Sequence, residues 1–246
     1  MSISPTAPWA LKGPRYAVID GDLLAYPAAA KLEKENDLEV VHQYLDANVL
    51  AVADMFNLDD WTVYLSTAAN FRRDVYPLYK ANRELTQRPR WLAPCKEFLY
   101  KQWAARAVAP YEADDLLGIS ITQAPEALLV SYDKDLKQIP GWHGDPRDGR
   151  ITYVTKEAGD RSFMLQLISG DSTDNCPGVY RVGPKKAEAW YNDNGWTLHS
   201  AAKLYIEKGY KYDYFGQMYK CLFILRKPTL EWEELDEVAS LFQAGT

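Results

Sequence analysis

Short apolar runs that alternate with stretches of helical periodicity limit the possible folds of this chain more than any other feature. The clearest run is RYAVID at 15–20, which ends in Asp20, and ALLVS at 127–131 has the same character. Near-continuous apolar runs are typical of parallel strands that are buried on both faces. Because helical stretches separate the runs, we predict an α/β fold with a mostly parallel central sheet and flanking helices.

The remaining elements follow from the same periodicities. Residues 38–56 repeat apolar side chains every three to four positions, which predicts one buried helical stripe. WTVYLS and RITYVT predict strands at 61–66 and 150–155, whereas GWHGDPRDG at 141–149 predicts turns. We expect further helices after Asp20 through Leu32 and at 113–122, 161–169, 185–192 and 214–227, and a short one in DKDLKQI.

Composition excludes several classes of protein. The 246 residues are 47% hydrophobic and 25% charged, which is ordinary for a globular protein and predicts a single globular unit. No apolar run approaches the roughly 20 residues of a membrane span, and we expect residues 1–14 to be a flexible leader rather than a secretory signal. We therefore expect a cytoplasmic protein. The three cysteines lack zinc-site spacing and predict reduced thiols.

The distribution of charge matters more than its sum. The formal net charge of −6 would count against nucleic acid as a partner. Between Phe71 and Arg106, however, nine basic residues stand against three acidic ones. One basic segment in an otherwise acidic chain indicates a local surface for phosphate groups.

Acidic residues gather at expected strand ends and helix starts. In parallel sheets, sites form beyond the carboxyl ends of the strands. Alone, each group is consistent with a helix N-terminus, where carboxylates cap free N–H groups. Together they would repel one another unless they bind cations, and oxygen ligands without His or Cys favour Mg²⁺ or Mn²⁺. The groups are Asp20; Glu112, Asp114 and Asp115; Asp133 and Asp135; Asp171 and Asp174.

Five motifs in order resemble one known family. VIDGD, YKANR, YEADD, SYDKDL and GDSTDNCPGVYRVGPKKA are similar to those of the 5′ nuclease superfamily, which includes phage 5′ to 3′ exonucleases, flap endonucleases and the 5′ nuclease domain of bacterial DNA polymerase I. The resemblance implies a PIN-like core at 15–160, with a helical arch at about 71–110. It also implies a helix-three-turn-helix element for duplex DNA within 161–246, followed by C-terminal helices.

The resemblance implies two metal sites. The first would comprise Asp20, Glu112, Asp114 and Asp115, with Asp115 also a catalytic acid. The second would comprise Asp133, Asp135, Asp171 and Asp174. Two Mg²⁺ or Mn²⁺ ions could activate water and stabilise the leaving oxygen of a phosphodiester.

The resemblance also implies the DNA contacts. Lys80 and Arg83 would neutralise the scissile phosphate as catalytic residues, next to Tyr79, and Tyr26 would stack on a base. Gly178, Gly183, Lys185 and Lys186 would hold a duplex backbone. Carbonyl groups around Val179 and Val182 would bind a potassium ion. Core packing for Tyr26 and solvated helix faces for the lysines are the structural alternatives.

The sequence departs from the family pattern at one position. The family has an acid after its second strand, where this chain has Ser66 and Thr67. A hydroxyl is a poorer cation ligand than a carboxylate, so we expect weaker Mg²⁺ binding, a shift towards Mn²⁺, or compensation by Asp74. Asp22 is interpreted as a loop acid. Pro89 and Pro94 are expected to interrupt helices in a short arch.

The function that these features favour is a metal-dependent 5′ nuclease acting as a monomer on DNA ends, flaps or nicks in replication or repair. RNA primers are a further candidate substrate. The alternatives are a branched-DNA-binding replication protein with a weakened metal site and a PIN-type ribonuclease. The sequence alone leaves open the balance between exonuclease and flap cleavage, the preference for DNA or RNA and the role of the last fifty residues.

Overall fold

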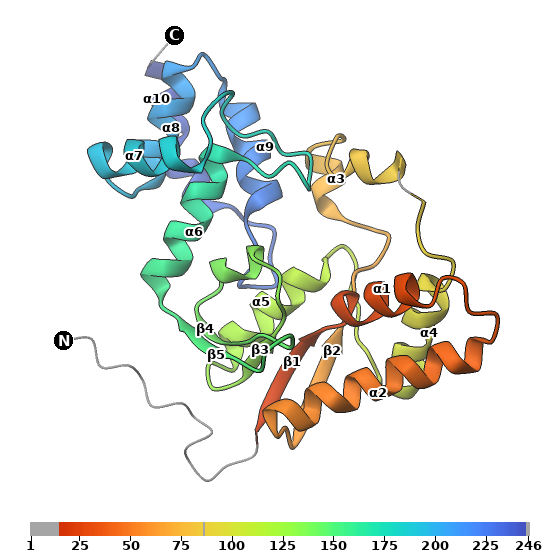
Figure 1. Cartoon of the computed structure of the whole chain (residues 1–246). Coiled ribbons are helices and arrows are strands. Elements are labelled where there is room, and N and C mark those ends of the chain that lie inside the picture. The colour runs from red at the N-terminus through yellow and green to blue at the C-terminus, as the bar shows by residue number, and fades with distance from the viewer. Residues whose placement is uncertain (1–14, 86, 245–246) are drawn as a thin grey trace.

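A computed structural model describes residues 15–85 and 87–244 of the chain, so the predicted leader at 1–14 lies outside the described residues. Its centre is a five-stranded sheet in the order β2-β1-β3-β4-β5 (Figure 1). The first four of these are parallel, and β5 is antiparallel to β4. The predicted α/β fold with a mostly parallel sheet is confirmed. The strands are β1 Tyr16–Asp20, β2 Asp60–Tyr64, β3 Leu128–Val130, β4 Gly141–Gly144 and β5 Ile151–Val154.

Helices bury the sheet on both faces. Ala17 and Ile19 of β1 pack in one apolar cluster with α1 Asp22–Lys31, α2 Leu38–Phe56 and α4 Leu92–Gln102. Val18, which points to the opposite face, packs with α5 Ala113–Gln123. This alternation explains why the apolar run in β1 is continuous, since both sets of side chains enter a core. The carboxyl ends of β1 and β2 lie side by side, with Asp20 opposite Tyr64.

The basic segment leaves the sheet after β2 and returns before α5. It contains the short helix α3 Phe71–Val75, the 3-10 turn η2 Ala81–Leu85 and α4. The prediction that Pro94 interrupts a helix is wrong. Pro94 is the third residue of α4, where its missing N–H would have no partner within the helix.

The C-terminal third forms a helical layer with its own apolar cluster. It comprises α6 Lys156–Ser169, α7 Pro184–Asn194, α8 Leu198–Glu207, α9 Tyr212–Leu222 and α10 Glu233–Ala244. In Figure 1 this layer (teal to blue) lies beside α3 and above the sheet. No helix in the described ranges is long and apolar enough to cross a membrane.

Several elements differ from the predictions. Gly141–Gly144 forms β4 rather than turns, because it pairs with both β3 and β5. The helix predicted to run to 227 ends at Leu222, and the backbone turns extended at Phe223. Arg72 binds the carbonyl oxygens of Cys221 and Phe223, which gives carbonyls at this helix end a partner. Helices α8 and α10 were not predicted.

Candidate active site

Asp20 is the buried centre of the site at the carboxyl end of β1. Its Oδ1 accepts hydrogen bonds from the backbone N–H groups of Asp22 at 3.1 Å and Leu23 at 3.3 Å. Ser131 Oγ lies 3.3 Å from Oδ2. Burial, followed by the charges of Asp22 and Asp133, raises the pKa of Asp20 to about 7. The surroundings of the Asp20 carboxylate therefore do not fully stabilise its negative charge.

Asp114 and Asp133 complete a group with Asp20 that we call the strand-end carboxylates. Asp114 lies in the first turn of α5, and Asp133 follows β3. Burial and then the charges of Asp20 and Asp133 raise the pKa of Asp114 well above its usual value, and the charge of Lys80 does not cancel this effect. Three carboxylates from three segments thus lie close enough for their charges to repel, and a cation between them would relieve that repulsion.

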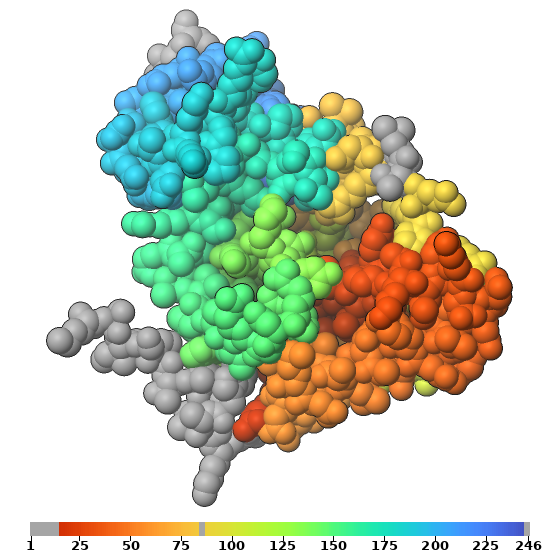
Figure 2. Space-filling view, in the orientation of Figure 1, coloured from red at the N-terminus to blue at the C-terminus, as the bar shows by residue number. Residues whose placement is uncertain are grey.

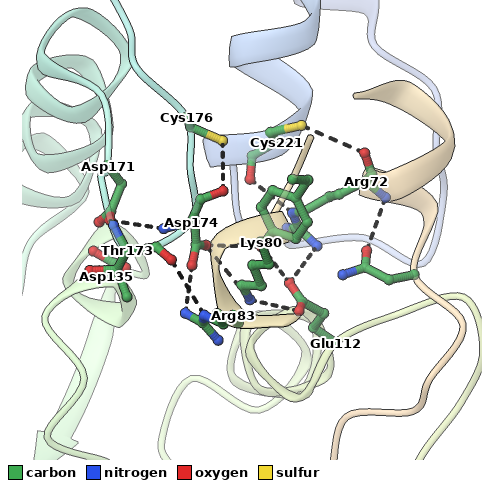
Figure 3. A network of polar contacts seen from close by, with 12 residues as sticks. Arg72, Lys80, Arg83, Glu112, Asp135, Asp171, Thr173, Asp174, Cys176 and Cys221 are labelled. Atoms are coloured by element: carbon green, nitrogen blue, oxygen red, sulfur yellow. Dashed lines mark hydrogen bonds and ion pairs between the residues drawn. The ribbon is translucent and has the colours of Figure 1, made fainter. Parts of the chain in front are cut away.

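Glu112 and Asp174 are held by basic and aromatic residues of the basic segment (Figure 3). The Tyr79 hydroxyl lies 2.7 Å from Glu112 Oε2 and 2.9 Å from Asp174 Oδ2. Lys80 Nζ lies 2.7 Å from Glu112 Oε1, and Arg83 Nη2 lies 2.7 Å from Asp174 Oδ1. Although burial opposes it, the charges of Lys80 and then Arg72 lower the pKa of Glu112 to about 2.

The backbone at Lys80 is strained to maintain this arrangement. Its φ of 55° lies in the left-handed region, which is uncommon for a residue with a side chain. The Lys80 N–H donates to the carbonyl of Asp174 at 2.9 Å, which ties the basic segment to the loop after α6. Lys80 and Arg83 are thus held against the acids of that loop.

Asp135 and Asp171 form a second pair around Lys134. Lys134 Nζ lies 2.9 Å from Asp135 Oδ1 and 2.7 Å from Asp171 Oδ2. Gln166 Nε2 donates to the same two oxygens. Burial raises the pKa of Asp135, whereas Lys134 lowers the pKa of Asp171 against the effect of burial. A cationic side chain therefore already bridges two acids of the predicted second metal site.

Asp115, predicted to be a metal ligand and a catalytic residue, contacts neither group in this structure. Its side chain is fully buried and forms a two-point ion pair with Arg72, at 2.6 and 2.8 Å. The backbone N–H groups of Glu112 and Leu225 donate to its two oxygens as well. With both oxygens saturated by internal donors, Asp115 holds the start of α5, the basic segment and the chain after α9 together.

The other predicted DNA contacts lie outside the acid groups. Tyr26 is 47% exposed on α1, so it is not a core residue. Lys185 and Lys186 are exposed in the first turn of α7, which begins at Pro184 as predicted. Gly183 is the N-cap residue of this helix, and space is open around it.

The turn before α7 depends on Gly178. Its φ is +62°, and a Cβ atom there would lie 2.4 Å from the backbone nitrogen of Gly170. Val179 is buried, and its carbonyl accepts a hydrogen bond from the N–H of Val182 at 3.1 Å. The Val179 carbonyl, one of the two predicted potassium ligands, is therefore already hydrogen-bonded in the turn.

Two groups near the site were missed as functional candidates. Asp22 is not a loop acid: it is the first residue of α1, and its carboxylate contacts Lys96 and the N–H of Ser66. Tyr132 is 36% exposed beside Asp133, with the Arg147 guanidinium 4.9 Å from its ring centre. The motifs VIDGD and SYDKDL contain Asp22 and Tyr132, but only their neighbours were interpreted as functional.

Ser66 and Thr67 have structural partners instead of a place among the acids. Ser66 Oγ accepts the N–H of Ala113 at 2.9 Å, which links β2 to the start of α5. Thr67 Oγ1 donates to the carbonyl of Ala69. Asp74 is exposed on α3, so its predicted compensating role has no support in its position.

The chemistry of the site suits hard divalent cations. Every acidic donor is a carboxylate oxygen, as Mg²⁺ and Mn²⁺ prefer. Asp22 Oδ1 is shielded from solvent yet has no hydrogen-bond donor in suitable geometry. Across residues 15–85 and 87–244, no three His, Cys, Asp or Glu side chains are close enough together to hold one ion as they stand. The donor set fits a divalent ion, and binding would require these side chains to converge.

Sequence comparison decides the family. Residues 15–158 match the family described as 5′-3′ exonuclease, N-terminal resolvase-like domain. The chain belongs to the 5′-3′ exonuclease family. It is 30% identical to an exodeoxyribonuclease of Enterobacteria phage T3 over 205 residues, which cover 72% of this chain and 66% of that protein. It is also 29% identical over 192 residues to flap endonuclease Xni of Shewanella oneidensis, covering 70% of this chain and 72% of that protein.

Solved structures agree on the fold. A flap endonuclease of bacteriophage T5, crystallised with DNA and metal ions, superposes with a TM-score of 0.67 at 15% identity. The match covers 94% of this chain and 98% of that one. The catalytic core of Rad2 with a DNA substrate gives a TM-score of 0.54 at 12% identity, over 94% of this chain and 73% of that one.

Proposed function

We propose that this chain hydrolyses phosphodiester bonds at 5′ ends or 5′ flaps of DNA in the presence of divalent metal ions. The observation that carries the proposal is a pair of ion pairs next to the strand-end carboxylates. Lys80 is paired with Glu112, and Arg83 is paired with Asp174. A site that positions cationic side chains beside an excess of carboxylates can receive both a phosphate and the metal ions that neutralise it. Membership of the 5′-3′ exonuclease family supports the same reaction.

The proposed metal ligands fall into two groups. Asp20, Asp114 and Asp133 would hold the first ion, because burial and the charge of Asp133 raise the pKa of both Asp20 and Asp114. Asp135, Asp171 and Asp174, with Glu112, would hold the second after Lys134 and Lys80 have moved aside. When bound, such ions supply an activated water and stabilise the leaving oxygen. Compared with the sequence-based assignment, Asp133 moves to the first group, Glu112 moves to the second and Asp115 leaves both.

The basic residues of the site have a role on the substrate. Lys80 and Arg83 neutralise Glu112 and Asp174 in the protein alone. With metal ions bound to these acids, the two cations would be available to bind the scissile phosphate. They would then place positive charge where negative charge develops during cleavage. Tyr79 would then orient Glu112 and Asp174 rather than contact DNA, because its hydroxyl is buried between them.

Duplex DNA would bind beside the second group. The turn before α7 and the exposed Lys185 and Lys186 offer backbone N–H groups and cations to a phosphate backbone. A potassium ion at the carbonyls of Val179 and Val182 would help to hold the turn. Tyr26 is exposed on α1, where it would stack on a base.

The experiment is cleavage of three 5′-labelled substrates by the purified chain: a DNA flap, a nicked duplex and a flap with an RNA 5′ segment. Each is incubated with Mg²⁺, Mn²⁺ or EDTA. We expect products with both metals and none with EDTA, and product lengths then distinguish flap cutting from exonuclease action. Tight binding without products in either metal would favour a DNA-binding protein, and cleavage confined to the RNA-containing substrate would favour a ribonuclease.

A further inference from the structure

Asp22 lies beside the end of β2, where the family pattern has an acid and this chain has Ser66 and Thr67. Asp20 and Tyr64 are paired in register, so Asp22 and Ser66 each lie two residues beyond that pair. The Ser66 N–H donates to Asp22 Oδ2 at 3.1 Å. The Asp22 carboxylate therefore reaches from the end of β1 to the backbone after β2, where Ser66 and Thr67 have no charge of their own.

Asp22 lies next to the strand-end carboxylates, because its backbone N–H donates to Asp20 Oδ1 at 3.1 Å. The second oxygen of its carboxylate, Oδ1, is shielded from solvent and lies 2.6 Å from Lys96 Nζ, outside hydrogen-bonding geometry. Lys96 instead donates to the carbonyl of Ser66 at 3.2 Å. One oxygen of Asp22 is thus held by the backbone, while the other is paired with the partly exposed Lys96 side chain.

We propose that Asp22 supplies the carboxylate that this chain lacks after β2. In the metal-free protein, the ammonium group of Lys96 in α4 would neutralise this carboxylate in place of a divalent ion. The inference rests on the proposed metal site. A divalent ion at the strand-end carboxylates would attract Oδ1 of Asp22, directly or through a water molecule. Lys96 would then withdraw, which makes α4 sensitive to the state of the site.

Moving one negative charge from position 22 to position 67 should first weaken and then restore metal binding. Asp22→Asn should weaken binding of the tighter Mn²⁺ ion about 10-fold or more, as for supporting groups at metal sites. Adding Thr67→Asp to Asp22→Asn should restore much of the affinity, because the charge returns at the end of β2. Asp213→Asn is the matched control, since it removes one exposed charge in the first turn of α9 and should leave affinity unchanged.

The measurement is calorimetric titration of the full chain with Mn²⁺ alone, without DNA, together with thermal melting of each variant. Unchanged Mn²⁺ affinity in Asp22→Asn would overturn the proposal, and so would a lower melting temperature with unchanged affinity, which would mark a structural role. Lys96→Gln provides a second test that leaves Asp22 in place. It should tighten Mn²⁺ binding several-fold, and weaker binding would contradict the role of Lys96.

The same titration separates this inference from the proposed function. If wild-type protein binds Mn²⁺ and cleaves DNA while Asp22→Asn binds equally well, only the role of Asp22 fails. If wild-type protein neither binds Mn²⁺ nor cleaves, the proposed function fails with it.

Discussion

Asp114 and Asp115 are adjacent in sequence, yet their substitutions by Asn should have opposite effects on stability. Asp115 is fully buried and paired with Arg72 through two contacts of 2.6 and 2.8 Å. Removing one member of a buried ion pair costs about 3–5 kcal/mol, because the other charge stays buried without compensation. Asparagine retains one acceptor oxygen, so we expect a loss of about 3 kcal/mol for Asp115→Asn, at the lower end of that range.

Asp114→Asn should behave differently. Its neighbours Asp20 and Asp133 raise the pKa of Asp114, as does its burial. Removing its charge therefore relieves repulsion in the metal-free protein. The melting temperature should stay the same or rise, while cleavage should be lost because a proposed metal ligand is gone.

Thermal melting without metal, followed by flap cleavage, measures both effects. For a chain of this size, about 3 kcal/mol corresponds to a decrease in melting temperature of about 6–12 °C in Asp115→Asn. A double-mutant cycle with Arg72→Met should show strong non-additivity, because the two residues share one interaction. If Asp115→Asn melts like the wild type but abolishes cleavage, Asp115 is a metal ligand and the structural assignment is wrong.

Three further predictions concern features outside the strand-end carboxylates. Burial lowers the pKa of His143 below 6.5, so the folded protein binds this proton less readily than the unfolded chain does. The stability that neutral His143 contributes is therefore present above about pH 6.5 and is lost as the pH falls. Unfolding by urea between about pH 7.5 and pH 5 should therefore show a smaller loss of stability in His143→Gln than in the wild type. Gly178→Ala should lower the free energy of unfolding by more than the ~1–3 kcal/mol expected from backbone strain alone, because the added Cβ atom would also clash with the backbone. Gly183→Ala should leave the melting temperature nearly unchanged, because space is open around it. Replacing Lys185 and Lys186 together by Ala should weaken duplex binding and reduce its salt slope by about 1.8, and an unchanged slope would remove them from the DNA interface.

The sheet and the places of the acids could be predicted because both depend on local patterns. β1 and β3 are buried on both faces, so their apolar runs are continuous, and an acid after such a run lies at the carboxyl end of the strand. β4 could not be predicted, since GWHG becomes a strand only through its pairing with β3 and β5. Its two glycines carry no strand signal of their own.

Which of the adjacent acids faces the site could not be predicted, for a different reason. Successive helical residues are about 100° apart around the axis, and the sequence does not say which of two adjacent acids faces the site. Asp115 instead contacts Arg72, 43 residues away along the chain. The position of Asp22 likewise depends on Ser66, a contact across 44 residues.

The rate of 5′-flap cleavage as a function of Mg²⁺ concentration, in the wild type and in Asp114→Asn, decides whether the strand-end carboxylates hold a metal ion that cleavage requires. Wild-type cleavage should require Mg²⁺ and saturate with it, while Asp114→Asn should keep its fold and DNA binding but lose cleavage. Cleavage that persists in EDTA, or an Asp114→Asn variant as active as the wild type, would show that they do not.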